Sequence, residues 1–180
     1  MTQLIAGVVE NIVNRAVSGQ TPAAATEAVV SGSQIVLQRA LKVGDIFQWR
    51  VSMTKTAAGT GNTAFKVKTN TTVTVATGTT GGAATAATLT FPVAETAAAS
   101  TAEVYIEALV RAVDPANGII DCDMTVINSS GVATGFSNQQ TAAVGSSLDT
   151  SNDILSVGLS IVTGAADAVT INYAEGRLLG

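Results

Sequence analysis

Residues 47–54, Phe-Gln-Trp-Arg-Val-Ser-Met-Thr, decide the fold of this chain. Apolar and polar residues alternate strictly along the stretch, and a period of two places every second side chain on the same face of a strand. The pattern predicts a half-buried β-strand whose apolar face carries Phe47, Trp49, Val51 and Met53. Trp49 is therefore interpreted as an anchor in the core rather than as a platform for ligand stacking.

The same alternation recurs along the rest of the chain. It predicts further strands within residues 65–75, 89–91, 104–112, 120–126, 155–161 and 169–173. Loops rich in Gly, Thr and Ser are expected at 57–63, 76–86, 94–101, 129–135 and 145–152. No long helical pattern falls between the strands, so parallel βαβ units are not expected. We expect an all-β chain folded as an antiparallel, jelly-roll-like β-sandwich of about eight strands.

The first 33 residues follow a different pattern. Apolar residues recur there every four positions, which is helical spacing, although most of them are β-branched and favour strands. We expect residues 1–33 to form an N-terminal arm or short helix and residues 34–180 to form the β-sandwich domain. Two interpretations stay open, a helix packed on its own domain and an arm ordered against a neighbouring subunit. The arm's partner-binding anchors would be Leu4, Ile5, Val8, Val9, Ile12 and Val13.

The composition removes most kinds of catalytic chemistry. The 180 residues include 30 alanines, 25 threonines, 17 glycines, one cysteine and no histidine. Without histidine there is no Ser-His-Asp or Cys-His nucleophile, and a single cysteine forms neither an intrachain disulfide nor a Cys-pair metal site. A net charge of −4 with scattered basic residues does not fit nucleic-acid binding. The sequence contains no run of 18 apolar residues, so no membrane span is expected. The first ten residues lack the basic region that begins a secretory signal peptide.

Three groups of acidic side chains are candidate chemical sites. Glu103 and Glu107 share one strand face, but four residues along a strand span about 13 Å, which is too far for a glycosidase carboxylate pair. Asp121 and Asp123, near the turn at 114–117, and the loop 149–153 are rich in the oxygen ligands that calcium prefers. Neither of these two candidate calcium sites has the residue spacing of a known calcium-binding loop. We expect no catalytic, cofactor or metal site.

The basic side chains and the single thiol are expected to have structural roles rather than binding or catalytic ones. Lys66 and Lys68, with Arg50 on another strand, could form a small basic patch, and solvated strand faces are the expected alternative. Cys122 lies in phase with apolar neighbours, so we expect a small buried side chain rather than a reactive thiol.

Residues 41–50, Leu-Lys-Val-Gly-Asp-Ile-Phe-Gln-Trp-Arg, are followed by a polar strand-loop-strand and by residues 106–113, Ile-Glu-Ala-Leu-Val-Arg-Ala-Val, with a glycine-containing turn. This order resembles a recurring pattern in virion proteins of tailed bacteriophages. These are small β-sandwiches rich in Thr, Ala and Gly, found as capsid decoration (cement) proteins and in tails or fibres. The resemblance covers residues 34–175 as a pattern of strands and carries no catalytic residues.

The resemblance implies a non-enzymatic virion structural protein. It would sit on the capsid surface after synthesis in the host cytoplasm and would bind between capsid subunits to stabilise the phage head. Its partners would be further copies of itself, as a homotrimer or dimer, and the major capsid protein, with no nucleic acid, membrane, small-molecule substrate or cofactor. The alternative is a tail or fibre module that binds host-surface carbohydrate through Trp49, Tyr105 or Tyr173. An enzyme built on Asp, Glu, Lys and Tyr would need carboxylates brought together from separate strands.

Overall fold

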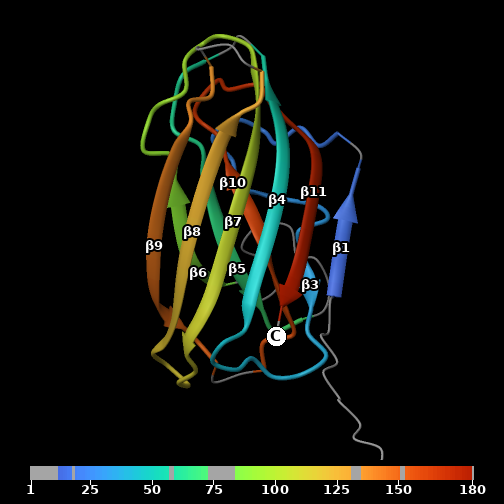
Figure 1. Ribbon diagram of the computed structural model, residues 1–180, viewed down its shortest axis with the longest axis vertical. Coiled ribbons are helices and arrows are strands. Elements are labelled where there is room, and N and C mark those ends of the chain that lie inside the picture. The colour runs from blue at the N-terminus through green and yellow to red at the C-terminus, as the bar shows by residue number, and fades with distance from the viewer. Residues whose placement is uncertain are drawn as a thin grey trace, which may run out of the picture.

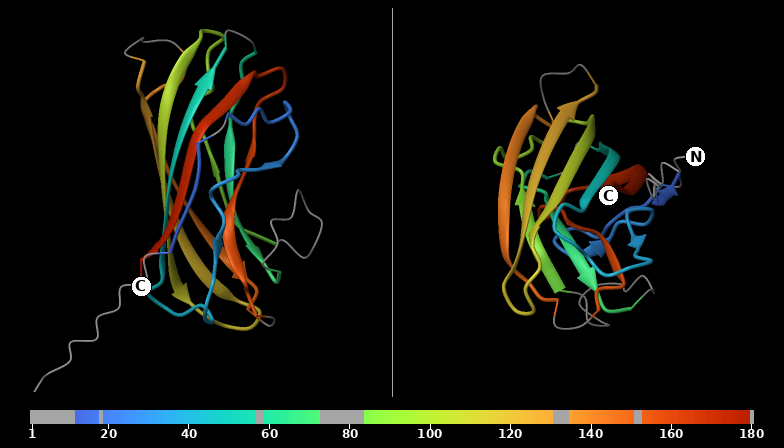
Figure 2. Two further views of the ribbon diagram at one scale, coloured as in Figure 1. Left: turned by 90° about the vertical axis from the view of Figure 1, so that its right-hand side faces the viewer. Right: turned by 60° about the horizontal axis from the view of Figure 1, so that its bottom comes forward.

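Two antiparallel sheets lie face to face in this chain (Figures 1 and 2). The computed structural model describes residues 12–17, 19–56, 59–72, 84–130, 135–150 and 153–179. Within them the strands are β1 (Ile12–Ala16), β2 (Ala28–Val29), β3 (Ile35–Val36), β4 (Ile46–Lys55), β5 (Ala64–Asn70), β6 (Ala84–Thr90), β7 (Ser100–Ala112), β8 (Gly118–Asn128), β9 (Gln139–Leu148), β10 (Ser156–Val162) and β11 (Val169–Leu179). The fold is the predicted all-β, jelly-roll-like sandwich.

The six-stranded sheet has the order β1-β11-β4-β7-β8-β9, and the other sheet has the order β2-β10-β5-β6, with β3 also paired to β10. The side view in Figure 2 shows the two layers edge-on. Among the described residues no helix is long and apolar enough to cross a membrane.

The core lies between the two inner faces, where the predicted alternation holds. In β4 every second residue is buried, and Trp49 is 2% exposed with its indole N–H donating to the Ser33 carbonyl oxygen at 2.7 Å. Phe65, Phe91 and Phe136 meet in the core with ring centroids 6.3 and 6.2 Å apart. The interpretation of Trp49 as a core anchor is confirmed.

The loop before β4 is held by one carboxylate. Asp45 accepts two hydrogen bonds from the Arg39 guanidinium, at 2.8 and 2.7 Å, and one from the Lys42 backbone N–H at 2.9 Å. Burial disfavours the charged carboxylate, but these hydrogen bonds and the Arg39 charge outweigh it and lower the pKa of Asp45. A bidentate pair of this kind fixes the point at which the chain turns into β4.

The helical prediction near the N-terminus is wrong where the structure describes it. Residues 12–16 form strand β1, which pairs with β11 from Ile12↔Leu178 to Ala16↔Ala174. The β-branched residues prevail over the spacing of four because an edge of the six-stranded sheet offers them hydrogen-bond partners. Farther along, β2 pairs with β10. The division of the chain at residue 33 stays a prediction, although the described part of the first segment contributes a strand to each sheet.

Strand β9 is the element that the sequence pattern did not reveal. Its sequence, Gln-Gln-Thr-Ala-Ala-Val-Gly-Ser-Ser-Leu, is polar or small at almost every position, so no alternation marks it. It also takes in part of the loop expected at 145–152. The strand expected over 65–75 ends at Asn70 as β5, and residues 73–83 lie outside the described part.

Small side chains let the two sheets approach closely beside β9. A Cβ built on Gly145 of β9 would lie 1.8 Å from the backbone oxygen of Ala86 in β6, which belongs to the other sheet. Cβ atoms do not approach an oxygen this closely, so the alanine- and glycine-rich composition is a packing requirement at this edge of the sandwich.

Replacement of Gly145 by alanine therefore forces the sheets apart locally. We expect Gly145→Ala to lower the free energy of unfolding by about 2 kcal/mol, measured by urea denaturation. Gly19→Ala is the matched control, because its Cβ would meet only the Thr170 methyl group at 3.5 Å and should change stability by less than about 0.5 kcal/mol. Equal stability of the two variants would contradict the close packing of β6 on β9.

Candidate functional site

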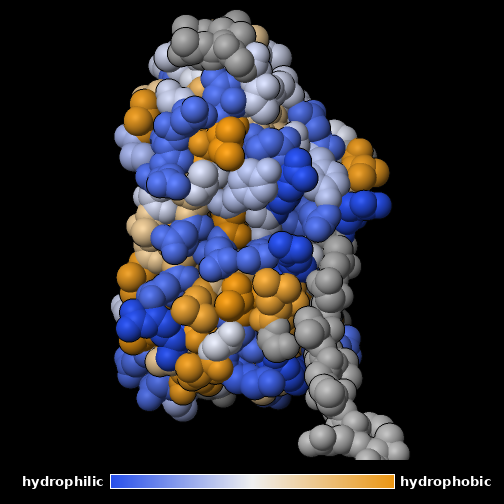
Figure 3. All heavy atoms as spheres, in the orientation of Figure 1, coloured by the Kyte–Doolittle hydropathy of each residue, from blue (hydrophilic) through white to orange (hydrophobic). Residues whose placement is uncertain are grey.

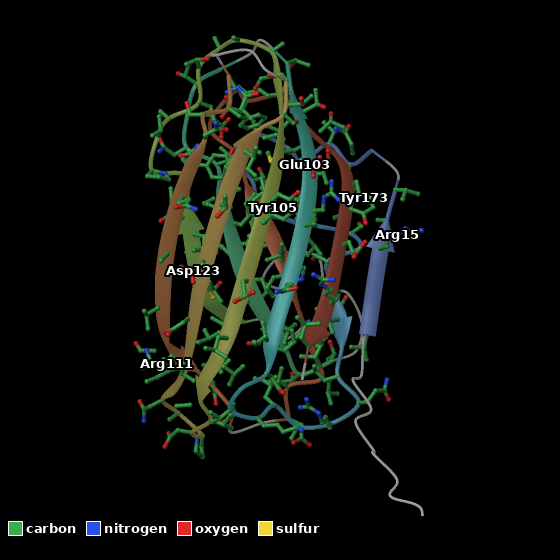
Figure 4. The ribbon with its side chains drawn as sticks, in the orientation of Figure 1. Arg15, Glu103, Tyr105, Arg111, Asp123 and Tyr173 are labelled. Carbon is green, nitrogen blue, oxygen red and sulfur yellow. The ribbon has the colours of Figure 1, made fainter. Side chains whose placement is uncertain are left out.

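The outer face of the six-stranded sheet carries most of the ionisable side chains that the structure brings together (Figure 4). Strand register orders them in rows that cross the sheet. One row runs Arg177–Gln48–Glu107–Asp123 and the next runs Arg15–Glu175–Arg50–Tyr105–Thr125, over β11, β4, β7 and β8, with β1 adding Arg15. We call these two rows the polar ladder.

Opposite charges and amides bind one another across the ladder. Gln48 donates to Glu107 at 2.6 Å and accepts from the Nε–H of Arg177 at 2.9 Å. Arg50 donates to Glu103, one row farther along, at 2.9 Å. The hydrogen bond to Glu103, and then the charge of Glu103, raise the pKa of Arg50. Cross-strand pairs of this type stabilise the sheet modestly and hold the side chains in fixed positions.

A shallow groove follows the ladder. Its volume is about 570 Å³, and its lining includes Arg50, Tyr105, Asp123 and Glu175. Tyr105 is 41% exposed, and the Arg50 guanidinium lies over its ring, 5.8 Å from the centroid. The groove therefore offers one aromatic ring, two guanidinium groups and several carboxylates. The groove suits a polar partner that has both hydrogen-bond donors and acceptors. The Arg50 guanidinium already covers one face of the Tyr105 ring.

The structure separates the two carboxylates that share a face of β7. Glu103 binds Arg50 and Glu107 binds Gln48, so the pair is divided between different partners. Glu107 instead stands opposite Asp123 in the register of β7 and β8. No group of three or more metal-ligating side chains occurs in the described part of the chain.

The oxygen-rich turn has a structural role. The Asp114 carboxylate accepts from the backbone N–H groups of Ala116 and Asn117, at 3.2 and 3.1 Å, which is turn chemistry. Asp121 binds Arg111 at 2.9 Å on the exposed strand face. Residues 151 and 152 of the second candidate loop lie outside the described residues.

The suggested basic patch is divided between the two sheets and is neutralised on one of them. Lys66 and Lys68 lie on β5, whereas Arg50 lies on β4 of the other sheet. Glu27 contacts both lysine ammonium groups, at 2.6 and 3.2 Å, and accepts from the Ser160 hydroxyl at 2.8 Å. Burial alone would raise the pKa of Glu27, but the hydrogen bonds from Lys66, Ser160 and Lys68 outweigh it and lower the pKa to about 2.

The thiol is buried, as the sequence predicts. Cys122 is 1% exposed on the inner face of β8. Burial, and then the charges of Asp121 and Asp123, raise its pKa to about 12. The thiolate is therefore scarce at neutral pH, and Cys122 packs as a small apolar side chain.

An apolar row crosses the same outer face next to the ladder. Leu179 of β11, Ile46 of β4 and Leu109 of β7 are register partners, and all three are half-buried. Val144 on the edge strand β9 is 67% exposed and extends the row beyond Asp121. Figure 3 shows apolar atoms gathered over the lower half of this face, below a more hydrophilic upper half. We call Leu179, Ile46, Leu109 and Val144 the apolar row.

The arm anchors lie mostly outside the described residues. This holds for Leu4, Ile5, Val8 and Val9, whereas the backbones of Ile12 and Val13 are part of β1 and their side chains are not described. Strand β1 begins at Ile12, which pairs with Leu178, next in the chain to Leu179 at the end of the apolar row. The sequence did not reveal the row, because its members come from four strands whose order and register one sequence does not state.

Comparisons with known proteins find no family. No protein-family model matches the chain, and no curated protein matches it. Among solved structures, the metal-free form of lectin I-B4 from Griffonia simplicifolia is similar over 97% of this chain and 96% of its own. The identity is 10% and the TM-score is 0.37. A likeness of this level gives no information about what the chain binds.

The lowered pKa of Glu27 predicts a pH-dependent contribution to stability. A carboxylate whose folded pKa lies near 2 and whose ordinary pKa is 4.5 stabilises the fold above pH 4.5, and this stability is lost as the pH falls toward 2. We expect Glu27→Gln to lower the free energy of unfolding at pH 7 by about 2 kcal/mol and the difference to disappear near pH 2. Denaturant titrations across this range measure it. Glu107→Gln on the exposed ladder is the control, and a pH-independent loss in Glu27→Gln would contradict the ion-pair account.

Proposed function

We propose that this chain is a non-enzymatic structural protein of a bacteriophage virion, a capsid decoration protein that binds between capsid subunits and stabilises the head. The observation that carries the proposal is the apolar row on the outer face of the six-stranded sheet, at the end where strand β1 begins. An apolar strip bordered by polar side chains is typical of a protein-binding surface.

The ladder beside the row supports contact with a protein surface. Its side chains already bind one another, from Arg177 through Gln48 to Glu107 and from Arg50 to Glu103. A face with its charges fixed in this way presents a set pattern to a partner and loses little side-chain entropy on binding. In the proposal, the row and the arm contact the major capsid protein and further copies of this chain, arranged as a trimer or dimer on the capsid surface.

The proposal is tested by binding to capsids of the phage that encodes the chain. We expect full-length protein to co-sediment with capsids that lack it, and we expect deletion of residues 1–11 or Leu109→Glu to weaken binding at least about tenfold, since a buried leucine contributes roughly 1.5 kcal/mol or more. Thr88→Glu, at an exposed position of β6 in the other sheet, is the matched control and should stay within about twofold. Absence of full-length protein from the capsid pellet, or unchanged binding by both altered forms, would overturn the proposal.

A second candidate function is carbohydrate binding in the groove, favoured by the 41% exposure of Tyr105 between carboxylates and guanidinium groups. A glycan array with the purified protein separates the two functions. The decoration protein should bind no glycan, whereas binding that is lost in Tyr105→Ala and kept in Ile127→Ala would favour the carbohydrate module. Trp49→Ala is unsuitable for this test, because Trp49 is buried and its loss would damage the core.

A further inference from the structure

Three ionisable side chains meet in the interior near the end of the sandwich where β4 ends and β11 begins. The Lys55 ammonium lies 3.0 Å from Oε2 of Glu95 and 3.1 Å from Oδ1 of Asp167. All three side chains are fully shielded from solvent. We call Lys55, Glu95 and Asp167 the Lys55 cluster.

The fold brings the cluster together from three separate segments. Lys55 is the last residue of β4 and follows Met53 on the inward-facing side. Lys55 pairs with Val169 of β11, and Asp167 lies two residues before Val169 in the chain. Glu95 comes from the loop after β6, where its Oε1 accepts from the Thr63 backbone N–H at 3.0 Å. The second carboxylate oxygen of Glu95 is thereby left facing the ammonium.

Glycine residues close the backbone around the Asp167 carboxylate. A Cβ on Gly164 would lie 2.2 Å from its Oδ2, and Cβ atoms on Gly59 and Gly61 would lie 2.7 and 3.1 Å from its two oxygens. Side chains at these positions would displace the carboxylate, so the three glycines leave the space that Asp167 occupies against Lys55.

The cluster is poorly satisfied as a purely ionic arrangement. It holds one cation and two carboxylates with no solvent access, and burial of charge is costly unless hydrogen bonds satisfy every oxygen. Among the described residues no donor reaches either oxygen of Asp167 with hydrogen-bond geometry, although the ammonium lies beside Oδ1. An amine, a carboxyl group and a second carboxylate in a dry pocket are the three components that amide formation requires.

We propose that Lys55 and Asp167 join through an intramolecular isopeptide bond, with Glu95 as the catalytic residue that moves the protons. Glu95 takes a proton from the Lys55 ammonium and passes it to the Asp167 carboxylate. The neutral amine then attacks Cγ of Asp167, so that an N–C bond forms. Glu95 transfers a second proton from nitrogen to the departing oxygen, the C–O bond breaks and one water molecule leaves. No oxidant, reductant or co-reactant is consumed.

The product relieves the buried charges. The ammonium and one carboxylate become a neutral amide, and Glu95 ends as a carboxylate that can accept from the Thr63 backbone N–H and from the new amide N–H. The bond also closes a covalent ring from residue 55 to residue 167, which contains β5 to β10. Such a ring restricts the unfolded chain, as a long-range disulfide does.

Intact mass of the purified full chain tests the proposal directly. We expect a mass lower than that of the sequence by one water molecule. Trypsin should then release residues 51–66 joined to residues 112–177, because cleavage after Lys55 is blocked and the nearest remaining sites are Arg50, Lys66, Arg111 and Arg177. Tandem mass spectrometry places the branch at Lys55 and Asp167, which separates it from water loss within a single aspartate. A full-chain mass equal to that of the sequence would overturn the proposal without any variant.

Two variants separate chemistry from packing. Glu95→Gln keeps the shape of the side chain but cannot carry the proton, so we expect the unmodified mass and earlier thermal unfolding than in the wild type. Asp167→Asn should still react and lose ammonia instead of water, giving a final mass identical to that of the cross-linked wild type. A purely structural ion cluster would leave all three proteins at their sequence masses. A branched peptide in Glu95→Gln at the wild-type level would remove Glu95 from the mechanism.

Discussion

One buried charge constrains the whole of this fold. Lys55 is the last inward-facing residue of β4, and its side chain is fully shielded from solvent. A buried ammonium is costly unless carboxylates lie beside it. Glu95 and Asp167 supply them from the loop after β6 and from the turn before β11. Correct placement of this charge therefore requires both segments to be folded, which couples the two sheets at one end.

The inside and the outside of the sandwich use the unusual composition differently. Inside, glycine and alanine allow backbones to meet where larger side chains would clash, at Gly145 against Ala86 and at Gly164 against Asp167. Outside, charged side chains are few, and they bind one another across strands, as Arg50 and Glu103 do. The outer face therefore carries paired charges over most of its length and an apolar row at one end.

Much of the architecture could be predicted from sequence because alternation is a local signal. It located β4, β7, β8, β10 and β11, whose inward residues are mostly apolar and whose outward residues are mostly polar. It did not reveal β9, where most inward positions carry small or polar side chains, and the helical alternative for the first segment is wrong where Ile12–Ala16 pair with β11. In β1 the neighbouring strand decided the structure, and the spacing of residues along the chain contains no information about that neighbour.

The candidate binding surfaces were less accessible from sequence, for a related reason. The apolar row and the polar ladder depend on the order β11-β4-β7-β8, which sets Leu179 beside Ile46 and Arg50 beside Tyr105. Alternation shows that these residues face outward, and the pairing of strands alone shows which of them touch. Lys55 did leave a local trace, since it is a charged residue in the inward phase of a strand, after Phe47, Trp49, Val51 and Met53.

The state of that lysine is the point on which the account depends most. A crystal structure of the full-length wild-type protein at high resolution would show it directly. We expect continuous density between Nζ of Lys55 and Cγ of Asp167, with an amide bond length of about 1.33 Å and a carboxylate of Glu95 in contact with the new bond. Separate side chains, with the ammonium and the Asp167 carboxylate still at hydrogen-bond distance in a fully folded molecule, would contradict it.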